Sequence, residues 1–260
     1  MKLILVCAAS AAAASAPGRT FRAARLTPTR SGETMPGAPL ALDAPGWGRG
    51  VGVGTGGRLW PCAATLARYL RDHPGLARGA RVLELGCGTG AVGLYCASRL
   101  GAADVMLTDG GRDALLELAR RNAAAVAAAA ADGGGGCAPV AVARHRWGRR
   151  DDAALDGEWG LVVGADVTYY VNFHAKLCAS LAALLAAPRP PRVLLAHQHR
   201  ALAALLACGV DASSDDAMLA RFADAAAAHG LAISTLRTER LAWHGLQDIS
   251  VLEVTRVDGG

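Results

Sequence analysis

The sequence predicts one α/β domain: a mostly parallel, seven-stranded sheet with helices on both faces and an antiparallel hairpin at one edge. Three observations support this fold. Short apolar runs alternate with helical stretches through the middle of the chain, which is typical of parallel strands joined by right-handed crossovers. A glycine-rich turn follows the first of these runs. The last two runs have only residues 238–248 between them and no helical crossover, so we expect them to pair as a hairpin.

The predicted strands are short, mainly apolar runs bounded by turn-forming residues. They cover residues 81–85, 104–108, 140–144, 161–165, 192–197, 231–237 and 249–255. The predicted helices carry apolar residues at helical spacing. They cover residues 61–71, 89–100, 112–126, 173–187 and 217–229. Pro61 suits the first turn of the first helix. The Ala- and Gly-rich tract 123–136 is expected to be a frayed helix end followed by a flexible surface insertion.

Composition and charge are those of a globular protein without an obvious polyanionic partner. The chain has 260 residues, of which 52% are hydrophobic and 19% are charged, so disorder throughout is excluded. The formal net charge is +5, but five of the 27 basic residues precede the first acid, Glu33. The remaining 22 equal the 22 acids in number, so the body is formally neutral and no nucleic-acid partner is expected.

The cysteines and the N-terminal segment limit the compartment only loosely. Seven cysteines occur without a Cys-x-x-Cys pair, so we expect neither a disulfide framework nor a metal site. Residues 1–45 are interpreted as a targeting segment or disordered leader, and residues 46–260 as the folded domain. The acid-free stretch through Arg30 is similar to an organellar transit peptide, which leaves an organelle or the cytoplasm as the location, with secretion less favoured. The apolar run within residues 1–45 is too short to span a membrane. The protein is expected to be a monomer.

The strongest chemical signal is the segment 82–90, Val-Leu-Glu-Leu-Gly-Cys-Gly-Thr-Gly. A buried strand carries an acid, Glu84, near its end and passes through glycines into a helix. Glycines allow a sharp turn and a close approach of a ligand to the main chain, while the helix start offers free amide groups. Gly88, Gly90 and Gly93 also fit a Gly-x-Gly-x-x-Gly pattern, so the motif alone is compatible with a dinucleotide.

Two acids favour S-adenosyl-L-methionine over NAD at this loop. Glu84 would repel a pyrophosphate but suits the methionine amino end of S-adenosylmethionine. Asp109 follows the next strand, where a carboxylate accepts hydrogen bonds from both ribose hydroxyls of either cofactor. An NAD-dependent oxidoreductase is further disfavoured because the only lysines are Lys2 and Lys176, which leaves no Tyr-x-x-x-Lys pair.

Five characteristic segments occur in order between about residues 54 and 256. They are Thr55-Gly56-Gly57-Arg58-Leu59-Trp60-Pro61, Glu84 to Gly90, Thr108-Asp109, Trp147-Gly148 and Gly164-Ala165-Asp166-Val167-Thr168-Tyr169. In this order they resemble the class I, seven-stranded methyltransferases with a Rossmann-like domain, and within them the protein-lysine branch grouped as methyltransferase family 16. The last segment is similar to the Gly-Ala-Asp-x-x-Tyr signature of that branch and is the most specific of the five.

The resemblance implies methyl transfer from S-adenosylmethionine to a lysine side chain of a protein acceptor. It implies cofactor contacts from Trp60, Gly86, Cys87, Gly88, Asp109, Trp147 and Ala165. Glu84 and Gly90 belong to the same predicted cofactor site. The two tryptophans suit this site because an aromatic ring attracts a sulfonium cation.

Asp166 and Tyr169 are the predicted catalytic residues, because they follow the fourth strand at the sheet edge where α/β folds bind ligands. The carboxylate of Asp166 would accept the N–H bonds of an amine nucleophile, and the ring of Tyr169 would shield that amine from water. An acceptor lysine, with an ordinary pKa of about 10.4, must lose its proton to attack, so desolvation in an aromatic pocket is expected to lower its pKa. Tyr170 is adjacent and suits either role.

Other functions stay open at this stage. The same fold could methylate small molecules or other amino acids, since fold and cofactor site do not determine the acceptor. A non-catalytic binding protein is less favoured, because the glycine loop and Asp166 are intact. His145 departs from the usual apolar residue of the branch. His197 and His199 lack a third ligand at metal-binding spacing, so we expect a polar loop on the substrate side, where Arg200 would hold an acidic or backbone group of the acceptor.

Overall fold

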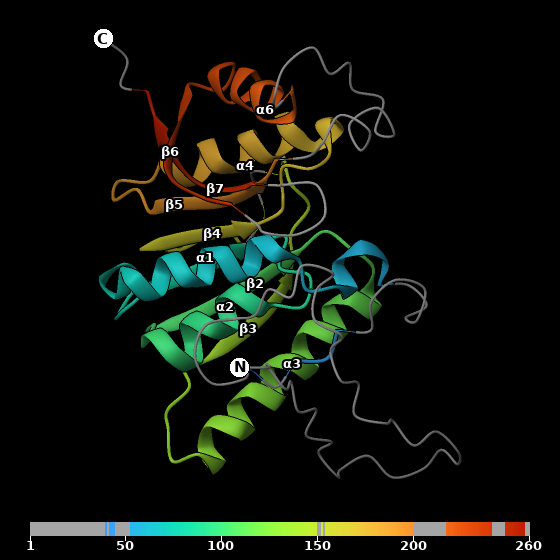
Figure 1. The fold of residues 1–260 in the computed structure, drawn as a ribbon, viewed down its shortest axis with the longest axis vertical. Helices are drawn as coiled ribbons and strands as arrows, with labels where there is room; N and C mark the ends of the chain where they lie inside the picture. Colours follow the sequence, from blue (N-terminus) through green and yellow to red (C-terminus); the bar gives the residue numbers. More distant parts are fainter. Residues whose placement is uncertain are drawn as a thin grey trace.

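The computed structural model describes residues 40, 42–44, 53–149, 152, 154–199, 217–240 and 248–257, and Figure 1 shows the fold. Seven strands form one sheet in the order β3-β2-β1-β4-β5-β7-β6. Their bounds are β1 Arg81–Leu85, β2 Asp104–Asp109, β3 Val140–Arg144, β4 Leu161–Ala165, β5 Arg192–Gln198, β6 Leu231–Arg240 and β7 Asp248–Arg256. Strands β1 to β5 pair in parallel, and β7 lies antiparallel between β5 and β6. The predicted parallel sheet and edge hairpin are therefore confirmed.

Helices cover both faces of this sheet (Figure 1). Their bounds are α1 Pro61–Asp72, α2 Ala91–Tyr95, α3 Asp113–Asp132, α4 His174–Leu185 and α6 Ala217–Ala227, with short turns η1 Gly54–Gly57, η2 Pro74–Leu76 and η4 Val171–Phe173 and a π-helical turn η3 Cys96–Leu100. Side chains of β1 alternate between the faces: Val82 packs with α1, α2 and α3, whereas Leu83 packs with α4 and α6. The helices thus bury two separate apolar layers against one sheet.

Helix α3 is longer than the sequence predicted. It continues to Asp132 through the alanine tract, so the expected fraying from Ala123 onward is wrong. Alanine has the highest intrinsic helix propensity, which favours continuation until the first glycine, Gly133. Gly134 adopts a left-handed conformation just beyond this end. The predicted helix 89–100 begins two residues later, at Ala91, and its last turn widens into η3.

The packed part of the chain includes residues that lie within the segment interpreted as a leader. Leu40 and Leu42 are buried in the layer beneath α1, α2 and α3. Asn122 of α3 holds the main chain beside them, because its side chain accepts a hydrogen bond from Asp43 N at 2.6 Å and donates to Asp43 O at 3.0 Å. The same amide donates to Thr89 O at 2.9 Å, next to the glycine loop. The interpretation of residues 1–45 as a targeting segment or leader stays a prediction, and residues 1–39, 41 and 45 lie outside the described residues.

Within the described residues, none of the helices combines the length and the apolar character needed to cross a membrane.

Replacing Asn122 with alanine should destabilise the fold, because it leaves buried main-chain groups of Asp43 and Thr89 without their partner. We expect Asn122→Ala to lower the free energy of unfolding by about 1–3 kcal/mol, measured by urea denaturation. Arg120→Ala, on the exposed side of the same helix, is the control and should change that free energy by less than about 0.5 kcal/mol. Equal effects of the two substitutions would contradict the bracing role of Asn122.

Candidate active site

One pocket of about 980 Å³ opens at the carboxyl ends of the central parallel strands. Ten of the eleven predicted site residues line it. They are Trp60, Glu84, Gly86, Cys87, Gly88, Asp109, Trp147, Ala165, Asp166 and Tyr169. The exception is Gly90, which does not line the pocket but caps the start of α2 in a left-handed conformation, with φ 81°. Residues spread over more than a hundred positions of the sequence thus meet in one cavity.

The glycine loop between β1 and α2 is the floor of this pocket. Gly86 and Gly88 both have positive φ, 64° and 54°, which side-chain-bearing residues rarely adopt. A Cβ on Gly88 would lie 2.8 Å from Gly56 O, and a Cβ on Gly86 would lie 2.8 Å from Val167 Cγ1. The loop therefore touches both the η1 turn and the segment after β4, and only glycine allows these approaches.

Glu84 lies under the first turn of α2. One carboxylate oxygen accepts a hydrogen bond from Gly93 N at 2.8 Å, and the side chain is only 2% exposed. Burial raises its pKa to about 8, against the opposing effect of the hydrogen bonds from Gly93 and Val92. The acid thus joins β1 to α2 and places an ionisable group at the pocket wall.

Asp109 ends β2 on the other side of the loop. Its two carboxylate oxygens accept hydrogen bonds from Gly88 N at 3.0 Å and Gly111 N at 2.7 Å. Burial raises the pKa of this acid, while those amides and Arg144 act in the opposite direction. Each carboxylate oxygen can accept more than one hydrogen bond, so Asp109 retains capacity for ligand hydroxyl groups. Burial also raises the pKa of the neighbouring Cys87 thiol, which keeps it neutral.

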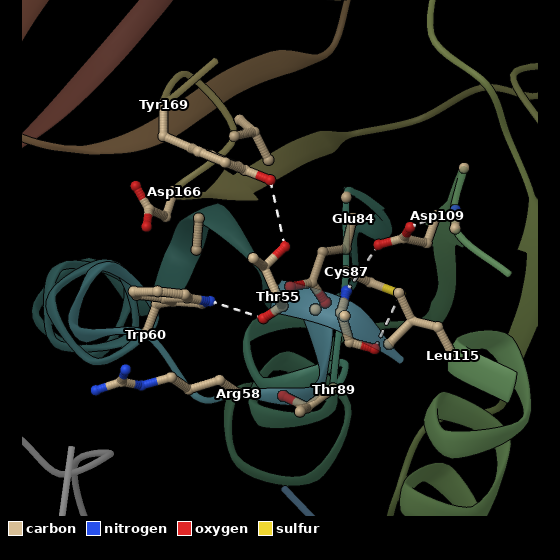
Figure 2. A pocket seen from close by; sticks show the side chains of 18 of the residues that line it. Thr55, Arg58, Trp60, Glu84, Cys87, Thr89, Asp109, Leu115, Asp166 and Tyr169 are labelled. Carbon is tan, nitrogen blue, oxygen red and sulfur yellow. Dashed lines mark hydrogen bonds between the residues drawn. The ribbon is translucent and has the colours of Figure 1, made fainter. Parts of the chain in front are cut away.

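The η1 turn and Trp60 form the wall opposite Tyr169, as Figure 2 shows. Trp60 Nε1 donates to Thr55 O at 3.1 Å, and the Arg58 guanidinium lies 4.8 Å from the centre of the indole ring. The hydroxyl groups of Thr55 and Tyr169 are 3.4 Å apart across the pocket. This contact joins the segment before α1 to the segment after β4, although 114 positions separate the two residues.

Asp166 has the one positive φ among the described non-glycine residues, 56°. Its main-chain N–H donates to Ala196 O of β5 at 2.9 Å, and its side chain is 6% exposed at the pocket wall. Asparagine and aspartate tolerate the left-handed conformation better than most residues. The turn that begins at Asp166 re-aims the chain after β4 and brings the carboxylate and Tyr169 to the same cavity.

Two buried histidines hold that turn in place. His174 Nε2 donates to Thr168 O at 2.8 Å, and His197 Nδ1 lies 2.6 Å from the Thr168 hydroxyl. Burial lowers the pKa of His174, which favours its neutral form. Thr168 itself is fully buried. The turn is therefore anchored from α4 and from β5.

A second buried network holds Trp147. The Ser180 hydroxyl accepts a hydrogen bond from Gly148 N at 3.0 Å and lies 3.0 Å from His145 Nε2, while His145 Nδ1 lies 2.9 Å from the Asp152 carboxylate. The Trp147 ring meets Phe173 edge-on, with ring centres 6.1 Å apart. His145, an unexpected polar residue in the sequence, thus has its partners inside the fold.

The expected position of His197 and His199 on the substrate side is wrong, whereas the predicted strand 192–197, which ends at His197, is confirmed by β5. His197 belongs to β5 and is fully buried, and His199 Nε2 lies 2.7 Å from the Ser250 hydroxyl of β7. Neither residue lines the pocket. No group of three metal-ligating side chains occurs among the described residues, and Arg200 lies outside them.

Several pocket residues were not predicted from the sequence. They are Thr55, Gly56, Arg58, Thr89, Gly110, Gly111, Arg112, Leu115, His145, Arg146, Val167, Phe173 and Lys176, with Val53, Gly54, Leu59, Ala63 and Ala91. Tyr170, which the sequence suggested as an alternative beside Tyr169, also lines the pocket. Most of the unpredicted residues adjoin a predicted site residue in the chain, so extending each motif by a few positions would have found them. Lys176 and Leu115 lie on helices and carry no such signal.

Comparison with known proteins agrees with this architecture. A family model described as lysine methyltransferase matches residues 47–205, more than half of the chain. The chain is 30% identical over 135 residues to the calmodulin-lysine N-methyltransferase of Arabidopsis thaliana, covering 52% of this chain and 42% of that protein. It is 32% identical over 130 residues to the protein N-lysine methyltransferase METTL21A of Mus musculus, covering 50% and 55%. The chain thus spans about half the length of the curated relatives it matches.

A solved structure supports the fold. The arsenic(III) S-adenosylmethionine methyltransferase of Chlamydomonas reinhardtii superposes with a TM-score of 0.52 at 22% identity, covering 70% of this chain and 65% of that one. This likeness and the strand order confirm the predicted Rossmann-like α/β fold with seven strands. Because the family model matches more than half of its length, the chain belongs to the lysine methyltransferase family.

Proposed function

We propose that this protein transfers a methyl group from S-adenosylmethionine to the side-chain amine of a lysine in a protein acceptor. The observation that carries the proposal is a pocket in which a glycine cradle, the buried Glu84, the partly buried Asp109 and the Asp166–Tyr169 turn face one another. Family membership and the lysine methyltransferases among the relatives support the same activity.

The residues present fit S-adenosylmethionine. Gly86 and Gly88 form a cradle that any Cβ would fill, so the main chain can lie close to a ligand. Asp109 would accept hydrogen bonds from ribose hydroxyls, and Glu84 would face the amino end of the methionine part. Trp60 and Trp147 supply aromatic surface for adenine and for a sulfonium cation. When bound, this cofactor supplies an activated methyl group.

Asp166 and Tyr169 are proposed to prepare the amine. The Asp166 carboxylate would accept N–H bonds of the lysine and aim its lone pair, and the Tyr169 ring would exclude water. The amine must be neutral, since its lone pair forms the new N–C bond while the methyl–sulfur bond breaks. Exposed Tyr170 and Phe173 continue the aromatic surface to the mouth of the pocket, which suits a macromolecular acceptor better than a small molecule. The monomeric state stays a prediction.

Substitution of Asp166 should separate catalysis from cofactor binding. We expect Asp166→Asn, which tolerates the left-handed backbone, to reduce methyl transfer by about 10²–10⁴-fold and Asp166→Ala to abolish it. S-adenosylmethionine binding, measured by calorimetry, should be largely retained. Transfer is measured with labelled cofactor and a methyl-depleted lysate, followed by mass spectrometry of the modified residue. Asp224→Asn, exposed on α6, is the matched control; wild-type turnover by Asp166→Ala would refute the assignment.

Cofactor binding should release a proton from Glu84. A cationic amino group near this acid stabilises the carboxylate, so its pKa falls from about 8 on binding. At about pH 6.5, below the pKa of an α-amino group, the ligand stays charged and up to about one proton leaves the protein. Calorimetry in two buffers of different ionisation enthalpy measures this release.

The variant Glu84→Gln provides the control for that measurement, because its amide oxygen can still accept the hydrogen bond from Gly93 N. We expect the proton release to vanish in this variant. We also expect wild-type affinity to rise from about pH 6 to pH 8, as Glu84 deprotonates, and the variant to lack this rise. Equal proton release by both proteins would exclude Glu84 as the group that responds to the ligand.

A further inference from the structure

The outer margin of the pocket is both cationic and aromatic. Eight of the residues that line it are exposed to solvent, and we call the five of them with cationic or aromatic side chains the mouth rim. They are Arg112, Arg146, Tyr170, Phe173 and Lys176. Tyr170 and Phe173 are 43% and 42% exposed and are two of the three large hydrophobic side chains exposed in the described part of the chain. Apolar exposure is therefore concentrated beside the candidate active site.

The three cations of the mouth rim have no carboxylate partner among the described residues. The Lys176 ammonium instead lies 5.7 Å from the centre of the Phe173 ring. Arginines elsewhere vary: the partly buried Arg144 next to the rim pairs with Asp113, and Arg192 on the far end of the sheet pairs with Glu253 at 2.7 Å. Exposed Arg78 and Arg99, like the rim cations, make no ion pair with a described residue. The positive charge at the pocket mouth is thus left for a partner to balance.

The acids of the pocket do not balance it. Glu84 and Asp109 bind main-chain amides beside the glycine loop, and Asp166 is 6% exposed. An acceptor lysine is itself a cation before it loses its proton, so the mouth rim would repel it during approach. Carboxylates that flank the lysine would offset this repulsion and pair with the rim.

We propose that the mouth rim selects protein acceptors in which acidic residues surround the target lysine. The inference rests on the proposed function and adds the chemistry of its acceptor. A protein–protein contact covers about 800 Å² per partner, enough to span the rim around the pocket. Arginine and aromatic residues are enriched in such contacts, which matches the rim composition. The charges at the rim would act mainly on the association rate and its salt dependence.

Binding of labelled peptides tests this proposal without requiring turnover. Three fluorescent peptides carry one lysine flanked by glutamates, by glutamines or by arginines, and anisotropy measures their binding in the presence of S-adenosylhomocysteine. We expect the glutamate peptide to bind about tenfold more tightly than the glutamine peptide, the arginine peptide to bind most weakly, and added salt to remove the difference. The double variant Arg146→Glu, Lys176→Glu should lose the preference.

The matched control is Arg120→Glu, Arg189→Glu, which makes the same charge change on exposed positions that do not line the pocket. It should keep the preference, and both double variants should keep the wild-type melting temperature. Equal binding of the glutamate and glutamine peptides would overturn the proposal, and so would a preference that survives reversal of the rim charges. Stronger, rim-dependent binding of a single-stranded oligonucleotide would assign the rim to nucleic acid and also overturn it.

The same preparations are assayed for methyl transfer to a lysate, which tests the proposed function separately. Charge-selective peptide binding without any methyl transfer would contradict the proposed function and would support only the binding of acidic peptides at the mouth rim. Methyl transfer without charge-selective peptide binding would support the proposed function and contradict the proposal for the mouth rim.

Discussion

The site depends on the common direction of five parallel strands. Because β1 to β5 all run the same way, their carboxyl ends lie at one edge of the sheet, and each loop after a strand reaches that edge. The glycine loop follows β1, Asp109 ends β2, Trp147 follows β3 and Asp166 follows β4. Chemistry-bearing residues that are far apart in the chain therefore share one pocket.

Buried polar residues brace the walls of that pocket from behind. Asn122 holds Asp43 and Thr89, Ser180 holds the backbone after Trp147, and His197 with His174 holds Thr168. Each of these groups is removed from water, so its hydrogen bonds must be made inside the protein. The positions of the pocket walls thus depend on residues that do not line the pocket themselves. The exception is His145, which contacts Ser180 and also lines the pocket.

Much of the fold followed from local pattern. Apolar runs such as 81–85 and 161–165 predicted strands to the residue, because fully buried parallel strands leave a continuous apolar signature. The prediction was wrong in the alanine tract, which is both low in complexity and high in helix propensity. It was interpreted as a frayed helix end, but its helix propensity extends α3 to Asp132. The local pattern also failed to place His197 and His199, which were expected on the substrate side, whereas neither lines the pocket and Thr168 supplies a partner for His197 inside the core.

The amino-acid sequence alone determined the order of the strands and helices and the motifs that end them, since both are local properties of residue type and spacing. Tertiary structure decided which of those residues are neighbours. The contact of Thr55 with Tyr169 and the close approach of Gly56 to Gly88 join segments whose spacing in the chain carries no distance information. Such contacts exist because the crossovers fold distant segments onto one sheet edge, and no short stretch of sequence records them.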